Sequence, residues 1–316
     1  MASEKLVFTN KPITCVGLGE ILWDLLPAGP RLGGAPANFT FHAKQMGLDS
    51  MAVSCVGNDE WGEKALKILQ EQQVKTLVFR SDKNTGYVQA SLNDRGVPTY
   101  EFALDTAYDH IPLNDEIIAV AKKTQVCCFG TLAQRQVNGE SHKTILAFLE
   151  AMPEKSLKVF DINLRENFFN RDVITAGLNR CTAFKCNDDE LPVVCKLLDT
   201  PEMTPVEFYE KVLHSIFGIE QFIYTAGERG SDIFYYGEHS FVPTPKVDVV
   251  DTVGAGDSFT ATFVGLTVQG VDFKVAHKTA ADVAAYVCTQ NGAMPVLSAE
   301  LLERVQSLVA AAAAAS

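Results

Sequence analysis

Short apolar segments with strand character alternate along this chain with segments of helical character, and this alternation limits the folds it can adopt. The main strands are expected at 13–17, 50–56, 125–129, 158–162, 183–186 and 221–224. The helices are expected at 35–46, 61–72, 138–151, 188–198 and 204–217. Strands that alternate with helices form a parallel sheet covered on both faces, because each crossover helix packs against the sheet. We therefore predict an α/β fold with a central, mostly parallel sheet flanked by helices.

One segment departs from this alternation. Residues Thr85–Leu92 alternate with a period of two, and a second such run, Thr99–Leu104, follows the turn residues Asn93–Gly96. This pattern predicts a β-hairpin. A hairpin inserted into an α/β chain indicates a small second sheet beside the main one. The polyalanine tail, 310–315, extends a helix that begins near Ser298, and we assign it no function.

The charge balance excludes some classes of partner. The chain has 27 Lys and Arg against 39 Asp and Glu, a net charge of −12, which argues against nucleic acid and anionic membranes as main partners. Uncharged stretches such as 258–271 are shorter than a membrane-spanning helix. The N-terminus, Met1–Lys5, has no signal-like apolar run. The eight cysteines form no CxxC pair and no ligand spacing with histidine, so reduced, buried cysteines of a cytoplasmic protein are expected.

Several familiar active-site motifs are absent from the sequence. The segment that begins Gly17-Leu18-Gly19 starts like a dinucleotide fingerprint, but Leu22 stands where the last small residue is needed. The chain contains no GxxxxGK[ST], no HExxH and no GxSxG. A Rossmann dinucleotide site, a Walker-type nucleotide site and the metalloprotease and serine-hydrolase motifs are therefore set aside.

The strongest functional motif is Asp251–Phe259, which precedes an apolar helical run. Its three consecutive small residues, Gly254, Ala255 and Gly256, open a helix whose N–H groups and dipole favour an anion. Asp257 lies in the first turn, where a carboxylate would repel a bound phosphate. That position suits a base that takes a proton from an attacking hydroxyl group while the amides stabilise the phosphoryl group. The alternative is a glycine-rich loop whose aspartate only complements the helix dipole.

A second candidate motif lies near the N-terminus. Asp24 ends an apolar run, and the glycines Gly33 and Gly34 precede Asn38 at the start of a helix. Two adjacent glycines allow a small molecule to approach closely, and an asparagine side chain both donates and accepts hydrogen bonds. Asp24 can accept hydrogen bonds from a pair of hydroxyl groups, so the motif is a candidate polyol site. The alternative is an ordinary Gly-Gly turn.

Together the two motifs resemble the signatures of the pfkB or ribokinase-like carbohydrate kinases, and the resemblance covers about residues 12–308. Gly19–Asp24, Gly33–Asn38 and 129–135 are most similar to bacterial fructokinases. Ribokinases usually carry Gly-Gly-Lys-Gly-Ala-Asn in the first motif, and this chain does not. The resemblance implies a sugar kinase with fructose as the first choice of substrate.

The resemblance also implies an architecture and a reaction. The expected structure is one ribokinase-like domain over 1–316, with a small β-sheet lid formed from about 21–32 and 85–104. The reaction would transfer the γ-phosphoryl group of ATP to a primary hydroxyl group of the sugar with Mg²⁺ present. Lids of this family often pair between two subunits, so the resemblance further implies a homodimer.

Roles for individual residues follow from the same resemblance. Asp257 matches the catalytic base, and Gly254, Ala255 and Gly256 match the anion hole. The positions that match sugar-binding residues are Asp24, Gly33, Gly34, Asn38, Asn163 and Arg165. The positions that match nucleotide-binding motifs are Asn187, Glu190, Thr225, Gly227, Gly230 and Asn291, with Glu190 also near the Mg²⁺ shell. Asp251 and the Val253 carbonyl match a site for a monovalent cation such as K⁺, although Val296 replaces a hydroxyl residue found there in several members.

Some alternatives remain open at the level of the sequence. Ribose, 2-keto-3-deoxygluconate or a nucleoside would fit the same family, and a non-catalytic sugar sensor would fit the same fold. A sensor would be expected to lose Asp257 or a glycine of the anion hole, and neither is lost. Asn187 and Glu190 could be a solvated helix turn, and Arg165 could be a surface ion-pair partner. Trp23 is either a core residue or a sugar-stacking residue.

Overall fold

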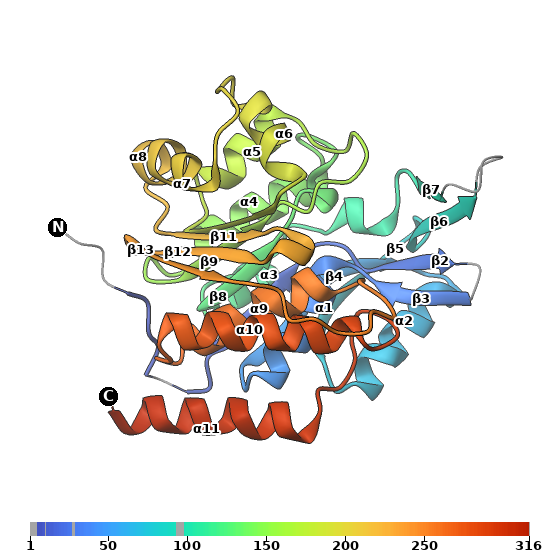
Figure 1. Ribbon diagram of the computed structural model, residues 1–316. Helices are drawn as coiled ribbons and strands as arrows, with labels where there is room; N and C mark the ends of the chain where they lie inside the picture. The colour runs from blue at the N-terminus through green and yellow to red at the C-terminus, as the bar shows by residue number, and fades with distance from the viewer. Residues whose placement is uncertain (1–4, 10, 27–28, 93–97, 316) are drawn as a thin grey trace.

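The computed structural model describes residues 5–9, 11–26, 29–92 and 98–315 of the chain (Figure 1). Within these residues the largest element is a nine-stranded sheet. Its strands in spatial order are β13 (Glu238–Val242), β12 (Ser231–Tyr235), β11 (Gln221–Thr225), β10 (Ala183–Asn187), β9 (Leu157–Asp161), β8 (Val126–Phe129), β1 (Thr14–Leu18), β4 (Asp49–Gly57) and β5 (Lys75–Ser81). The strands from β5 to β11 pair in parallel, whereas β12 and β13 are antiparallel. The predicted mostly parallel sheet is confirmed.

Helices cover both faces of this sheet, as Figure 1 shows. One layer contains α1 (Ala35–Gln45), α2 (Glu60–Glu71), α9 (Ala255–Thr267), α10 (Phe273–Cys288) and α11 (Ala299–Ala315). The other contains α3 (Asp115–Ala121), α4 (Glu140–Ala151), α5 (Arg171–Leu178), α6 (Glu190–Leu197), α7 (Pro205–Phe208) and α8 (Ser215–Phe217). Successive residues of β8 alternate between the two layers: Val126 and Cys128 pack with the first, Cys127 and Phe129 with the second. This alternation explains why the central strands are apolar throughout.

The predicted helix 204–217 differs from the structure. In the structure this segment is divided into α7, a π-helical turn at Tyr209–His214, and α8. Its ends follow the sequence signals: Thr204 and Glu207 form a capping box, and Gly218 ends the segment in the left-handed conformation. Side-chain periodicity alone did not indicate the wider hydrogen-bonding pattern in the middle.

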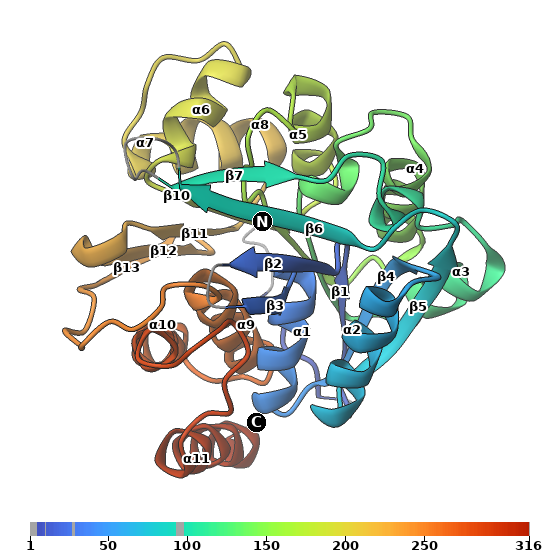
Figure 2. The same cartoon turned by 90° about the vertical axis from the view of Figure 1, so that its right-hand side faces the viewer.

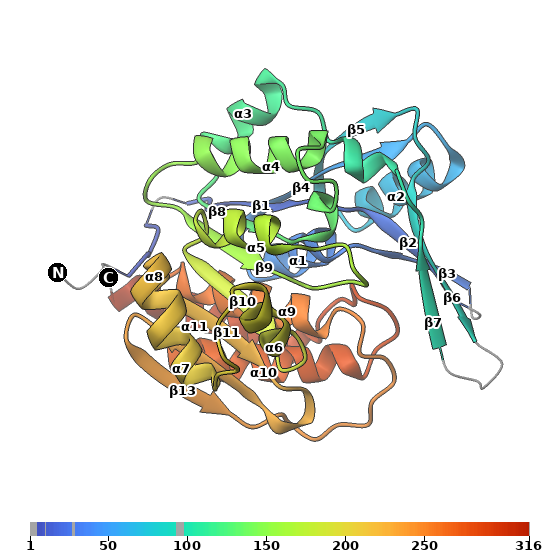
Figure 3. The ribbon, with the colours of Figure 1, turned by 90° about the horizontal axis from the view of Figure 1, so that it is seen from above.

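A separate small sheet contains four strands in the order β3 (Gly29–Gly33), β2 (Leu22–Leu26), β6 (Gly86–Leu92) and β7 (Pro98–Phe102). Figure 2 shows these strands face-on, and Figure 3 shows the sheet projecting from one side of the large sheet. β6 and β7 pair in antiparallel register, which confirms the predicted hairpin, while its turn lies outside the described residues. The predicted second sheet is therefore present, and its role as a lid stays a prediction.

Trp23 anchors the small sheet to the rest of the molecule. Its indole N–H donates to the Trp61 carbonyl at 3.0 Å, and the two indole rings lie 4.9 Å apart. Only 4% of Trp23 is exposed. Of the two alternatives for this residue, the structure therefore favours a core residue.

The cysteines are free and mostly buried. All eight cysteines are free thiols, and seven are buried, with Cys288 partly exposed. Burial raises the pKa of the Cys55 thiol to about 12, so this thiol is poorly reactive. Along the described part of the chain, no helix has both the length and the apolar character needed to cross a bilayer.

Candidate active site

The connections of the large sheet diverge between β1 and β8. From β1 the chain proceeds outward through β4 to β5, and from β8 it proceeds in the opposite direction through β9 and β10 to β11. In open α/β sheets, ligands bind at such a point, beyond the carboxyl ends of the strands. A small cavity lies there, lined by Glu20, Ala35, Pro36, Cys128, Phe129, Gly130, Thr131, Leu132, Asp161, Asn163 and Asp257. The fold thus brings the predicted base Asp257 and the predicted sugar residue Asn163 to one cavity.

The turn Gly254–Gly256 presents backbone N–H groups at the start of α9. Gly254 has a φ of 80°, and a Cβ atom there would lie 2.6 Å from the Ala293 carbonyl oxygen, so only glycine fits. Among the described residues, no side chain caps this helix. The Ser258 N–H donates to the Gly254 carbonyl at 2.9 Å, and the N–H groups of Gly256 and Asp257 face beyond the helix end. This geometry suits an anion site, as predicted for the turn.

Asp257 is held in place by Asn38 of α1. The Asn38 amide donates from Nδ2 to Asp257 Oδ2 at 2.8 Å. Burial raises the pKa of Asp257 above the usual range of an aspartate, although this hydrogen bond and the charges of Lys185 and Arg165 oppose the increase. Asp257 as a whole is half-buried and lines the cavity. Asp257 is thus oriented, reachable and more basic than an ordinary aspartate, which are the properties that a general base needs.

The predicted polyol residues lie where β2 and β3 meet the start of α1. A Cβ atom on Gly33 would lie 2.5 Å from Asp24 Oδ2, so the carboxylate occupies the space that the glycine leaves. Burial raises the pKa of Asp24. At Gly34, which has a φ of 112°, a Cβ atom would lie 2.3 Å from the Glu20 carbonyl oxygen. Asn38 Oδ1 is buried and has no hydrogen-bond partner among the described residues, so it is available to a ligand hydroxyl group.

Lys185 is a site residue that the sequence motifs did not identify. It lies in β10, is 6% exposed, and donates from Nζ to Asp161 Oδ1 at 3.0 Å. A Cβ atom on Gly256 would be 3.4 Å from Lys185 Nζ, so the ammonium group adjoins the anion-binding turn. Burial alone would lower its pKa, but the carboxylates of Asp161 and Glu190 hold the pKa above its ordinary value. A lysine inside the apolar strand Ala183–Asn187 was the sequence signal that could have found it.

Asn187 and Glu190 bind each other at the start of α6. The Asn187 side-chain oxygen accepts from the Glu190 N–H at 2.8 Å, and Glu190 Oε2 accepts from the Asn187 N–H at 2.8 Å. Glu190 Oε1 accepts from the Leu164 N–H at 2.8 Å and so fixes the segment that contains Asn163. Each carboxylate oxygen keeps a second lone pair, which fits the predicted contact with water in a Mg²⁺ shell. The arrangement explains their spacing structurally, and their role near the phosphates stays a prediction.

The other predicted nucleotide residues lie beyond β11 and α10. Thr225 ends β11, and Gly227 and Gly230 flank a tight turn with φ values of 52° and 137°. The Asp188 N–H donates to the Thr225 carbonyl at 3.0 Å, so this turn adjoins the Asn187 segment. Asn291 is exposed in the segment after α10. These positions lie at the same edge of the sheet as the cavity, and their nucleotide contacts stay predictions.

Asn163 and Arg165 come from the segment that follows β9. Asn163 has a φ of 37° and lines the cavity. Arg165 is exposed, but its charge lowers the pKa of both Asp24 and Asp257, which places the guanidinium within electrostatic reach of the site. Arg165 is therefore available to a substrate that enters between these carboxylates.

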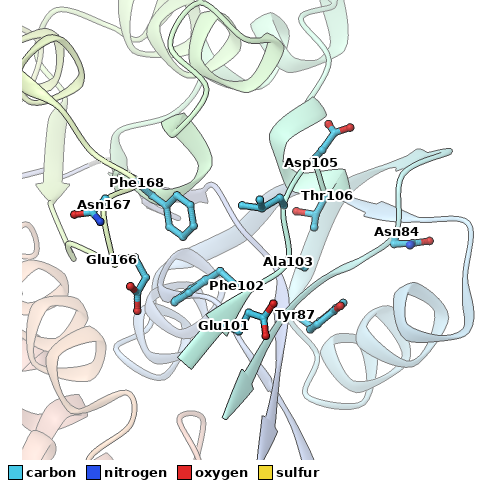
Figure 4. A pocket seen from close by; sticks show the side chains of 11 residues that line it. Asn84, Tyr87, Glu101, Phe102, Ala103, Asp105, Thr106, Glu166, Asn167 and Phe168 are labelled. Carbon is cyan, nitrogen blue, oxygen red and sulfur yellow. The ribbon is translucent and has the colours of Figure 1, made fainter. Parts of the chain in front are cut away.

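A larger, open groove adjoins this segment at the edge of β7 (Figure 4). Phe102 and Phe168 both line it and pack edge to face, with their ring centroids 5.6 Å apart. Glu101, from β7, and Glu166 contribute carboxylates to the lining. The groove is therefore aromatic and acidic, which suits a neutral or cationic ligand better than an anionic one.

Of the groups predicted to hold a monovalent cation, the Asp251 carboxylate has other partners. Asp251 Oδ2 accepts from Arg31 Nη1 at 2.5 Å and from the Gly292 N–H at 3.1 Å, and Asp251 Oδ1 accepts from the Val253 N–H at 3.1 Å. The described residues contain no group of three or more His, Cys, Asp or Glu side chains arranged for a metal ion. The Arg31 guanidinium group neutralises the Asp251 carboxylate in this structure. The K⁺ assignment stays a prediction.

The raised pKa of Asp257 predicts an acidic limit to activity. A general base must be ionised, so kcat/KM should fall as the pH decreases through a pKa above the ordinary aspartate value. Asn38→Ala removes a hydrogen bond that lowers this pKa, so the acidic limb should move to higher pH. The pH dependence of kcat/KM for both proteins tests this, and an unshifted limb would contradict the assignment.

Comparison with known proteins gives a consistent set of relatives. The model of the pfkB family carbohydrate kinases matches residues 29–300. A fructokinase from Klebsiella pneumoniae is 30% identical over 301 residues, covering 89% of this chain and 94% of the relative. An ATP-dependent 6-phosphofructokinase from Thermoanaerobacterium thermosaccharolyticum is 26% identical over 310 residues, covering 92% and 93%.

A solved structure shares the fold over nearly the whole chain. An uncharacterized sugar kinase from Pyrococcus horikoshii, in complex with ATP, superimposes with a TM-score of 0.77 at 24% identity. The match covers 93% of this chain and 100% of that protein. The ribokinase-like architecture expected from the sequence is confirmed.

Proposed function

The chain belongs to the pfkB family of carbohydrate kinases, and we propose that it transfers the γ-phosphoryl group of ATP to a primary hydroxyl group of fructose. The observation that carries this proposal is the placement of Asp257. Its carboxylate is oriented by Asn38 and lies in the first turn of α9, beside N–H groups that no side chain caps among the described residues. A base beside an anion site is what transfer of a phosphoryl group to a hydroxyl group requires.

The reaction follows from these residues. Asp257 takes the proton as the hydroxyl O–H bond breaks, a new O–P bond forms in line, and the bond to the β-phosphate oxygen breaks to release ADP. The N–H groups of Gly256 and Asp257, together with Lys185, stabilise the charge on the transferring group. Mg²⁺ bound to the ATP phosphates would neutralise part of their charge, with Glu190 assigned to its hydration shell.

The sugar would lie between the small sheet and the cavity. Asp24 and Asn38 Oδ1 are acceptors for its hydroxyl groups, Asn163 lines the cavity, and the charge of Arg165 reaches Asp24. We assign the small sheet the role of a lid that excludes water and so limits hydrolysis of ATP. A homodimer that pairs through this sheet remains part of the proposal.

We propose fructose rather than a sugar phosphate as the acceptor, because the groove beside the site contains carboxylates. The relatives include both a fructokinase and a 6-phosphofructokinase, whose substrates differ by one phosphate group. In this chain Glu101 and Glu166 line the adjoining groove, where they would repel a substrate that already has a phosphate. A neutral ketose avoids this repulsion.

An ADP-release assay with Mg-ATP tests the substrate. We expect fructose to exceed ribose, glucose, 2-keto-3-deoxygluconate, adenosine and fructose 6-phosphate by about tenfold or more in kcat/KM, because one unmatched polar contact costs roughly 1–3 kcal/mol. Preference for another sugar would replace fructose and keep the kinase. ATP binding without turnover on any acceptor would favour the non-catalytic sensor.

A further inference from the structure

An ion pair joins the small sheet to the loop that precedes α9. Arg31 of β3 and Asp251 are 220 residues apart in the sequence, and their side chains are 33% and 15% exposed. The distance between Arg31 Nη1 and Asp251 Oδ2 is 2.5 Å. A charge-assisted bond between partly buried groups is stronger than an exposed ion pair. The contact is therefore able to fix the position of one segment relative to the other.

On one side, the ion pair is connected to the backbone segment that leads into the anion-binding turn. Asp251 accepts N–H groups from Val253, directly before Gly254, and from Gly292. The N–H groups of Val250 and Asp251 donate to the Cys288 carbonyl at 2.8 and 3.2 Å, which ties the loop to the end of α10. A shift of the Asp251 carboxylate would therefore move the chain that enters the turn.

On the other side, the pair adjoins the proposed sugar site. Arg31 lies opposite Asp24 in the antiparallel register of β2 and β3, so the two side chains share a face of the small sheet. The charge of Arg31 lowers the pKa of Asp24, and the charge of Asp251 raises it. The guanidinium group thus lies between the carboxylate assigned to the sugar and the loop assigned to the phosphoryl group.

We propose that Arg31 is a positioning residue that connects the sugar-binding face of the small sheet to the loop 251–253, which leads into the anion-binding turn. This inference rests on the proposed function, because it takes the assignments of the two sites from it. A sugar held against Asp24 fixes β2 and β3. Arg31 holds Asp251, and through it the loop 251–253 keeps the N–H groups of the turn aligned with the bound acceptor.

The test combines kinetics with a binding measurement. We expect Arg31→Gln and Asp251→Asn each to lower kcat by about 10- to 100-fold, as misplacement of reacting groups does, while the ATP dissociation constant measured by calorimetry changes by less than about threefold. The double variant should be no slower than the slower single variant, because both lose the same contact. Arg180→Gln, which removes an Arg–Glu150 pair of 2.6 Å away from the site, should retain wild-type kinetics.

Hydrogen exchange supplies a readout that does not depend on turnover. Fructose should protect the amides of 250–258 in the wild type and not in Arg31→Gln. Three results would each overturn the inference. They are a loss of kcat in the double variant equal to the product of the two single losses, equal protection of these amides by fructose in both proteins, and full rescue of Arg31→Gln activity by K⁺. Rescue would show that Asp251 needs only a counter-charge. A wild type that phosphorylates no sugar would instead overturn the proposed function.

Discussion

The Asp257→Asn variant is expected to turn over sugar about 10³- to 10⁴-fold more slowly than the wild type, the full contribution of a positioned base. Asparagine has the same shape as aspartate and can still accept the Asn38 hydrogen bond through its side-chain oxygen. It cannot take the proton of the attacking hydroxyl group. The loss should therefore appear in kcat, and steady-state assays at saturating sugar and ATP measure it.

Affinity for ATP separates this role from a structural one. Removal of the Asp257 charge relieves repulsion of the phosphates, so the ATP dissociation constant should be unchanged or lower in Asp257→Asn. Asp115→Asn is a matched control, because Asp115 is an exposed aspartate in the first turn of α3. Near-wild-type turnover by Asp257→Asn would exclude this residue as the base.

The large sheet was predictable because its signals are local. Each buried strand is a short apolar run, and each crossover helix has its own period, so the order of elements implies the parallel sheet. The anion-binding turn was equally visible, because three small residues before an apolar helix are contiguous at Gly254–Gly256. Such features need no knowledge of distant segments.

Other features depend on distant partners. β3 contains Gly29, Pro30 and Gly33, which are poor strand formers, and it is a strand because β2 supplies its hydrogen bonds. The role of Arg31 depends on Asp251, 220 residues away. Lys185 lies in an apolar strand, and its charge is explained by contacts outside that strand, with Asp161 of β9 and with the turn at Gly256.

Lys185→Met is expected to lower kcat by about 10²- to 10³-fold, which is typical for the loss of one preorganised group that stabilises transition-state charge. The ammonium group adjoins the anion-binding turn, and one of its three donors is used by Asp161. Methionine has a similar length and fills the same apolar path through β10. The change therefore removes the charge with little change in volume.

The same change should also destabilise the fold, because it leaves Asp161 buried without its partner. Breaking a buried ion pair in this way costs about 3–5 kcal/mol in the free energy of unfolding. Lys75→Met is the matched control, since the Lys75–Asp49 pair is exposed and should contribute less than about 1 kcal/mol. Denaturant unfolding of both variants measures the difference.

Pairing Lys185→Met with Asp161→Asn separates stability from catalysis. The double variant no longer buries an unpaired charge at Asp161, so most of the free energy of unfolding should return, whereas kcat should remain low because the cation beside the turn is still absent. Recovery of kcat together with stability would show that Lys185 serves only to neutralise Asp161. Low turnover in a stable double variant would instead assign the buried lysine to the transferring phosphoryl group, alongside the amides of Gly256 and Asp257.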